Sequence, residues 1–296
     1  MHLDSPPFIS KALPRLRQAA AGLLCALTAA LHGPALGAPS PVTVAMDQVL
    51  WLYTGDRFHC QLKLSVENFG TLRFVHQAGQ ELNFQVDTLL NPGATPAVSL
   101  ESSLWRQAPA QPPMRLEQKP EGLVLNAEHT RQLLAALHQR LWFGIELSRL
   151  KLNVPTVHWE ATAEQFEQCQ ERLSPLSVAQ ARDRALFYTQ GQRALSTEQL
   201  QELAQLARYI ALDPQVSRVL VDSYTDNTGS RLGNLQLSRE RAADVAAALR
   251  EFGVPAKLIE QRAHGERYPS ANNATPEGRD LNRRVTLRII RTKNGN

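Results

Sequence analysis

The sequence predicts an α+β protein built from two different halves. Residues 39–175 alternate apolar and polar side chains with a period of two, which is typical of strands, and leave room for one or two helices. Residues 183–292 instead alternate strands with amphipathic helices in the order βαβαββ, which predicts a sandwich of a mixed sheet with helices on one face. The segment 174–182 carries neither pattern and is predicted to be a linker.

The first 38 residues have the three-part layout of a secretory signal peptide. Basic residues precede the apolar run 19–31, and small residues suited to cleavage follow at 32–40. The apolar run is shorter than the roughly 20 residues that span a bilayer. We therefore expect an exported chain, cleaved near residue 38, with no membrane span in the mature protein.

Several strands and one helix are predicted in the first half. Alternation predicts strands at 58–66, 72–77, 82–89, 97–105 and 144–154, the second and third forming a hairpin. Three prolines make 106–115 a loop. A helix is expected over 126–142, with Asn126 as its N-cap.

A disulfide is predicted between Cys60 and Cys169. These are the two cysteines that remain after cleavage, and export to an oxidising compartment favours one bond between them over two buried thiols. Cys60 lies on the strand 58–66. Cys169 faces inward on a helix that a capping box at Thr162 and Gln165 is expected to start.

The second half is predicted from helix caps and breaks. Strands are expected at 185–189, 217–225, 259–264 and 284–291. A capping box at Ser196 and Gln199 starts a helix that runs to 212. A second helix, 234–252, is expected to end at Gly253.

A candidate binding site follows the strand 217–225. Its carboxyl end presents Thr225 and Asp226 in a Gly/Ser/Asn-rich turn, where ligands bind in many α/β sheets, and Arg241 lies on the next helix. A carboxylate and a guanidinium kept apart from each other suit a zwitterion, because one accepts from an ammonium and the other binds a carboxylate. The spacing alone favours the alternative, a plain Asp226–Arg241 ion pair that stabilises the turn.

Three stretches, 224–242, 253–269 and 273–285, resemble the OmpA family of peptidoglycan-binding C-terminal domains. The shared pattern is a TD-x-x-GS turn, an LS-x-x-RA helix, a GE-x-x-P loop and an NRRV strand start. The resemblance implies that Asp226 and Arg241 bind the diaminopimelate of the peptidoglycan stem peptide. The resemblance also places Thr225, Asn234 and Leu237 near the pocket. For Arg284 it leaves two roles open, a contact in the pocket or stabilisation of the sheet.

The stretches 58–86, 166–177 and 186–196 resemble the MotY family of periplasmic flagellar motor proteins. The resemblance implies a soluble periplasmic component of the bacterial flagellum basal body. Its first half, 39–175, would contact motor parts, and its second half would bind peptidoglycan to anchor or recruit stator units. The alternative is a general envelope tether of the OmpA or Pal kind. A lipid anchor for such a tether is disfavoured, because Leu24 stands before Cys25 where a lipidation motif needs a small residue.

Other function classes lack support in the sequence. The eight histidines include no pair at metal-ligand spacing, and no nucleophile or phosphate-loop motif occurs, so we expect neither an enzyme nor a metal or cofactor. A net charge of +4 without a dense basic run argues against nucleic acid as a partner. A stator subunit would need a membrane-spanning helix that carries an acid.

Overall fold

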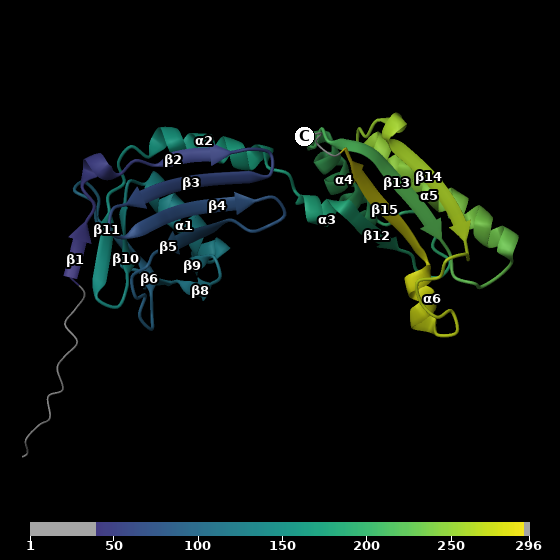
Figure 1. Cartoon of the computed structure of the whole chain (residues 1–296), viewed down its shortest axis with the longest axis horizontal. Coiled ribbons are helices and arrows are strands. Elements are labelled where there is room, and N and C mark those ends of the chain that lie inside the picture. The colour runs from purple at the N-terminus through teal and green to yellow at the C-terminus, as the bar shows by residue number, and fades with distance from the viewer. Residues whose placement is uncertain (1–39, 293–296) are drawn as a thin grey trace, which may run out of the picture. The chain divides into compact units, whose positions relative to one another are not determined.

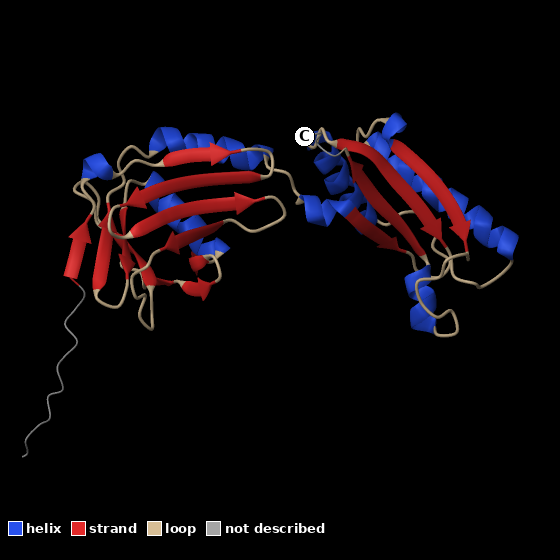
Figure 2. Ribbon diagram, viewed as in Figure 1, coloured by secondary structure: helices blue, strands red, loops and turns tan. Residues whose placement is uncertain are grey.

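A computed structural model describes residues 40–292, and the predicted signal peptide lies outside that range (Figure 1). Helices and strands are mixed throughout, which confirms the α+β class (Figure 2). One hydrophobic core gathers residues between Val44 and Leu173, and a second gathers residues between Leu176 and Ile289. Within the described range no helix is both long enough and apolar enough to cross a membrane.

The first core is enclosed by two sheets and two helices. One sheet has the order β1-β11-β10-β6-β7 and the other the order β2-β3-β4-β5-β9-β8. The elements are β1 (Ser40–Thr43), η1 (Met46–Gln48), β2 (Leu52–Gly55), β3 (His59–Val66), β4 (Gly70–Gln77), β5 (Asn83–Asp87), β6 (Ala97–Glu101), β7 (Met114–Arg115), β8 (Glu117–Lys119), β9 (Gly122–Leu125), α1 (Ala127–His138), β10 (Trp142–Glu146), β11 (Leu150–Val154) and α2 (Glu160–Arg172).

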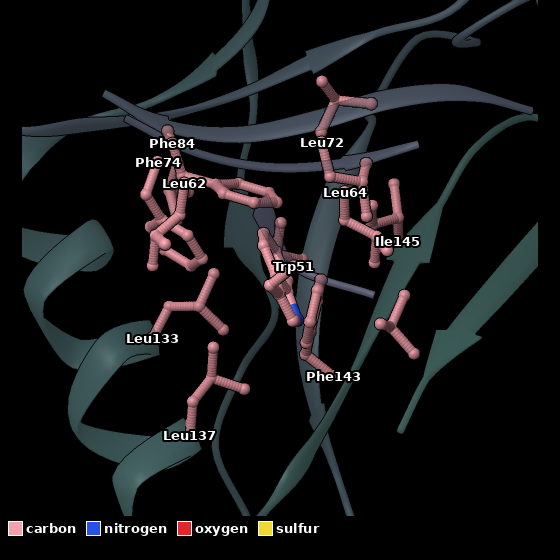
Figure 3. Packing of buried hydrophobic residues seen from close by; sticks show 14 of the residues in the cluster. Trp51, Leu62, Leu64, Leu72, Phe74, Phe84, Leu133, Leu137, Phe143 and Ile145 are labelled. Atoms are coloured by element: carbon pink, nitrogen blue, oxygen red, sulfur yellow. The ribbon is translucent and has the colours of Figure 1, made fainter. Parts of the chain in front are cut away.

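Aromatic side chains fill the centre of this core (Figure 3). Trp51 packs against Phe74 and Trp159, with ring centroids 5.6 and 5.4 Å apart. Leucines of β3 and α1 surround these rings, because strand alternation and helical spacing each direct one apolar face inward. The predicted disulfide is present: Cys60 on β3 is bonded to Cys169 on α2.

Three local predictions in this half are wrong. The helix expected over 126–142 is capped by Asn126 but ends at His138, and the chain re-enters a strand at Trp142. The predicted capping box at Thr162 does not form, because α2 already begins at Glu160 and the Thr162 hydroxyl donates to the Trp159 carbonyl. The stretch 144–154 forms parts of two strands, β10 and β11, joined by a turn.

The second core lies between one sheet and its helices. The sheet has the order β12-β15-β13-β14, in which β13 and β14 are parallel and the other pairs are antiparallel. Helices α4 and α5 lie on one face of it (Figure 1). The elements are α3 (Val178–Arg182), β12 (Asp183–Phe187), α4 (Thr197–Leu212), β13 (Val216–Tyr224), α5 (Arg231–Glu251), η2 (Ala256–Leu258), β14 (Ile259–Gly265), α6 (Pro276–Asn282) and β15 (Arg284–Arg291).

The helices of this half follow the sequence signals with three exceptions, which are the start of α5 and the presence of α3 and α6. The capping box of Ser196 and Gln199 forms, and Gly253, at φ 92°, follows the end of α5. However, Ser230 caps α5, so this helix begins at Arg231 and not at 234. The segment 174–182 contains the short helix α3, and α6 was not expected.

Candidate functional site

The turn after β13 holds Asp226 in a fixed position. The Thr225 amide donates to the Gly265 carbonyl (2.9 Å), and Asp226 Oδ1 accepts from the Thr228 amide (2.9 Å). This side-chain turn, together with Gly229 at φ 95°, reverses the chain before α5 begins. The sequence therefore places the carboxylate at the carboxyl end of the strand, with one oxygen committed to the turn.

Asp226 has an ionic partner that the sequence did not predict. Its Oδ2 accepts from Arg283 Nη1 at 2.6 Å, and Arg283 also contacts Asp280. The charge of Asp226 is thus already neutralised inside the protein. A carboxylate nevertheless has about four lone-pair positions, so these two contacts leave capacity for another donor.

Arg241 is almost completely buried and only partly satisfied. Arg241 lies on α5 and is 1% exposed to solvent. Nη2 donates to the Gln192 carbonyl (2.6 Å), and the guanidinium carbon lies 4.3 Å from the centre of the Tyr188 ring. Nε and Nη1 have no hydrogen-bond partner. Two charged donors without acceptors in a buried position are rare in proteins, because each costs about 1–3 kcal/mol.

No hydrogen bond or ion pair joins Asp226 to Arg241 in the described chain, so the alternative of a plain ion pair does not hold. The two charges still act on each other, since Asp226 and Arg283 both influence the pKa of Arg241, which burial lowers. Burial raises the pKa of Asp226, but the Arg283 ion pair and the Thr228 amide outweigh it, and the pKa lies below its ordinary value. Asp226 is therefore charged at neutral pH, and Arg241 is charged because a guanidinium stays protonated in proteins.

Asn234 joins the turn to the loop after β14. Its side-chain amide donates to the Asp226 carbonyl (3.2 Å) and to Glu266 Oε2 (2.9 Å). Beside it, the Gly265 amide donates to Ser238 Oγ (3.0 Å). A Cβ on Gly265 would lie 3.1 Å from the Leu235 amide nitrogen, so this loop approaches α5 closely only because glycine stands there.

The remaining predicted site residues are Thr225, Leu237 and Arg284, and they differ in how they are placed relative to Asp226 and Arg241. The Thr225 hydroxyl is buried next to Asp226 and has no partner. Leu237 is half-buried on α5, one turn before Arg241. Arg284 lies 4.1 Å from the centre of the Tyr224 ring and donates to the Tyr268 carbonyl (3.3 Å). It contacts neither Asp226 nor Arg241.

Two residues of the site were missed, and strand alternation would have found both. Arg283 directly precedes β15 and is buried like Val285 two positions later, whereas Arg284 between them points to the opposite face. Tyr188 likewise continues the inward side of β12 after Leu186. Reading NRRV as a period-2 pattern therefore assigns its first arginine, not its second, to the site.

This arrangement can bind a small group that carries both charges. An ammonium would share Asp226 with Arg283, and a carboxylate would accept a charge-assisted hydrogen bond from Nε or Nη1 of Arg241, the two nitrogens that have no partner. The Thr225 hydroxyl supplies one further donor or acceptor. Among residues 40–292 no cluster of three His, Cys, Asp or Glu side chains is arranged to hold a metal ion.

Comparison with known proteins separates the chain into two matched regions. Residues 43–175 match the MotY N-terminal domain, and residues 187–283 match the OmpA family. The sodium-type flagellar protein MotY of Vibrio parahaemolyticus is 26% identical over 255 residues, which cover 79% of this chain and 84% of that protein.

Shorter similarities are confined to part of the chain. The peptidoglycan-binding protein ArfA of Mycobacterium tuberculosis is 48% identical over 71 residues, 24% of this chain and 22% of its own length. The crystal structure of the peptidoglycan-associated lipoprotein of Burkholderia pseudomallei matches 36% of this chain and 90% of its own, with 27% identity and a TM-score of 0.35.

Proposed function

Because the chain joins a MotY N-terminal domain to an OmpA family domain, we propose that it is a non-enzymatic periplasmic component of the flagellar motor that binds peptidoglycan. The similarity to a flagellar protein extends over 84% of that protein's length and includes both halves of this chain, which supports the motor role. The similarity to a peptidoglycan-binding protein supports a role of the second half in binding the cell wall.

The buried Arg241 carries the wall-binding proposal. Diaminopimelate has an ammonium and a carboxylate at its side-chain end, and Arg241 offers two unused donors within reach of the charge on Asp226. Binding would turn an unsatisfied buried donor into a charge-assisted hydrogen bond, and this gain offsets the desolvation of the ligand. Thr225 and Asn234 would order the turn around the ligand.

The mechanical part of the proposal is that wall binding helps to hold stator units at the basal body. Stator units push on the rotor and experience an equal reaction force. Peptidoglycan is the rigid frame of the periplasm, so a protein that binds the wall with one domain and motor parts with another can transmit this force. Residues 43–175 would supply the motor contact in this scheme.

Sedimentation with purified sacculi tests the wall-binding site. We expect Arg241→Met to lower the affinity at least about thirtyfold, since removing one partner of a buried charged contact costs about 2–5 kcal/mol. The free energy of unfolding should not fall in this variant by more than about 1 kcal/mol, because methionine removes two unsatisfied donors along with one hydrogen bond.

Arg239→Ala is the matched control, because Arg239 is exposed on the same helix. Equal sedimentation of Arg241→Met, Arg239→Ala and the wild type would contradict the proposed site. The motor role is tested separately by deleting the gene. Paralysed cells with assembled filaments would support it, whereas normal swimming with a defective envelope would favour the general tether.

A further inference from the structure

The face of the β12-β15-β13-β14 sheet opposite α4 and α5 carries a continuous row of aromatic and basic side chains. The row consists of Phe187, Arg284, Tyr224, His264 and Tyr268, and we call it the open-face row. Phe187 pairs with Arg284 across β12 and β15. The Arg284 guanidinium covers the Tyr224 ring at 4.1 Å, and this ring stacks on His264 at 4.7 Å and 15°. Each of the four strands contributes a side chain.

The row borders the Asp226–Arg241 site along the sheet. Phe187, Tyr224 and Arg284 are the chain neighbours of Tyr188, Thr225 and Arg283, respectively. Since successive side chains of a strand point to opposite faces, the same strand ends supply the buried site on one face and the row on the other. A ligand longer than one amino acid that is held at Asp226 can therefore reach around the sheet end to the row.

Exposed aromatic rings end the row on both sides. Phe187 is 52% exposed and Tyr268 is 68% exposed. Tyr268 has φ 62°, an uncommon angle for a bulky residue, and it is held there by the Arg284 hydrogen bond to its carbonyl and by edge-on contact with His264. A strained backbone that presents an aromatic ring to solvent beside a binding site is typical of a functional position.

The charges next to the row are mostly neutralised within the protein. A cavity of about 450 Å³ extends from Tyr224 and Arg284 along the sheet face. Two residues of its lining, Arg288 and Asp183, form an ion pair (2.7 Å). A third lining residue, Arg184, forms an ion pair with Glu202, which lies outside the cavity (2.9 Å). Asp222 likewise contacts His264 (2.7 Å). The surface therefore offers aromatic faces and many hydrogen-bonding groups but little net charge, which suits a neutral ligand rich in hydroxyl and amide groups.

We propose that the open-face row binds the sugar rings of the peptidoglycan glycan strand while the attached stem peptide occupies the Asp226–Arg241 site. The inference rests on the proposed wall-binding function. Pyranose rings have an apolar C–H face that packs on aromatic rings and a rim of hydroxyls, and Tyr268 and Phe187 offer the first contact. Arg284, His264 and Asp222 offer donors and acceptors for the rim and for the N-acetyl groups.

Calorimetry with two ligands tests this inference. One ligand is a disaccharide–tetrapeptide that contains diaminopimelate, and the other is the same tetrapeptide without sugars. We expect the mature wild-type chain to bind the sugar-bearing ligand about tenfold more tightly, equivalent to about 1.4 kcal/mol. Tyr268→Ala should remove this gain and leave the affinity for the free tetrapeptide unchanged. Phe187→Ala should act in the same direction.

Ile290→Ala is the matched control, because Ile290 is an exposed apolar residue on the same face of β15, away from the row. Equal wild-type affinities for the two ligands would overturn the inference and leave the stem-peptide site intact. Failure of both ligands to bind would overturn the proposed wall-binding function as well. A dimer in sedimentation velocity that Tyr268→Ala abolishes would assign the row to self-association and also overturn the inference.

Discussion

At the scale of single residues, the candidate site depends on a buried guanidinium that the protein leaves incomplete. Arg241 makes one hydrogen bond and one ring contact, and two of its nitrogens have no acceptor. Asp226, by contrast, is paired with Arg283 and with a backbone amide. The acid is thus stabilised by the fold, whereas the arginine gains most from a ligand. This asymmetry predicts that ligand binding stabilises the second half of the chain.

The Asp226–Arg283 pair predicts a pH-dependent stability. The pKa of Asp226 is lower in the folded chain than in the unfolded chain, so its stabilising effect is complete above the ordinary aspartate pKa of about 3.9 and is lost as pH falls through the folded value. Asp226→Asn should cost about 3 kcal/mol at pH 7, because Arg283 loses its buried partner.

Unfolding of the wild type and of Asp226→Asn at several pH values measures this effect. The difference in unfolding free energy between the two should shrink below about pH 4. Asp244→Asn is the control, since Asp244 is exposed on α5. A difference that stays constant from pH 7 to pH 3 would show that the Asp226 charge does not stabilise the fold.

At the scale of elements, the end of β13, the following turn and the start of α5 act as one unit. Ser230 accepts from the Gly233 amide and starts α5, and this start fixes where Asn234 and Arg241 lie along the helix. Strand alternation then sorts neighbouring residues of β12, β13 and β15 to the two faces of the sheet. A short stretch of sequence can therefore serve a buried site and an exposed surface together.

Removal of the α5 cap should weaken this unit. We expect Ser230→Ala to lower the free energy of unfolding of the second half by about 1 kcal/mol, because the Gly233 amide loses its acceptor. Ser230→Asn should keep most of the wild-type stability, because the asparagine side chain also accepts from that amide. Thermal unfolding followed by circular dichroism gives the measurement. All four tryptophans precede residue 160, so an unchanged tryptophan fluorescence transition serves as an internal control. Equal stability of Ser230→Ala and the wild type would contradict the assigned cap.

At the scale of the whole molecule, the chain has two hydrophobic cores that are stabilised in different ways. The first core is closed by the Cys60–Cys169 disulfide, which joins residues 109 positions apart. The second contains no cysteine and depends on packing between the sheet and helices α4 and α5. The residues of the proposed wall-binding site all belong to the half without the disulfide.

Loss of the disulfide should therefore affect the two halves unequally. In the double variant Cys60→Ala/Cys169→Ala, the free energy of unfolding of the first half should fall by about 2–5 kcal/mol, because its unfolded state is no longer cross-linked. Tryptophan fluorescence reports this transition. Sacculus sedimentation should remain close to that of the wild type. A matched pair of substitutions away from the bond, Ser65→Ala with Gln168→Ala, serves as the control. Loss of sacculus binding in the cysteine variant alone would show that the wall-binding site depends on the first half.

Local patterns in the sequence were sufficient for the α+β class and for the four strands and two long helices of the second half, although they missed α3 and α6. The Cys60–Cys169 pair followed from the cysteine count and the expected export. Alternation and capping are properties of neighbouring residues, so a single sequence displays them. The same local signals misplaced the C-terminal end of α1 and the start of α2, because the chain re-enters a strand at Trp142 and α2 already begins at Glu160.

Only the tertiary structure decided what each charged residue does. The sequence places Asp226 and Arg241 fifteen positions apart, but it does not reveal that Arg283 reaches Asp226 or that a loop carbonyl and Tyr188 hold Arg241. Contacts between residues far apart in the chain depend on which strands pair and in what register, and register is set by the packing of the whole sheet. The sequence by itself therefore determined which groups are available, and the fold determined which of them are already paired and which remain free for a ligand.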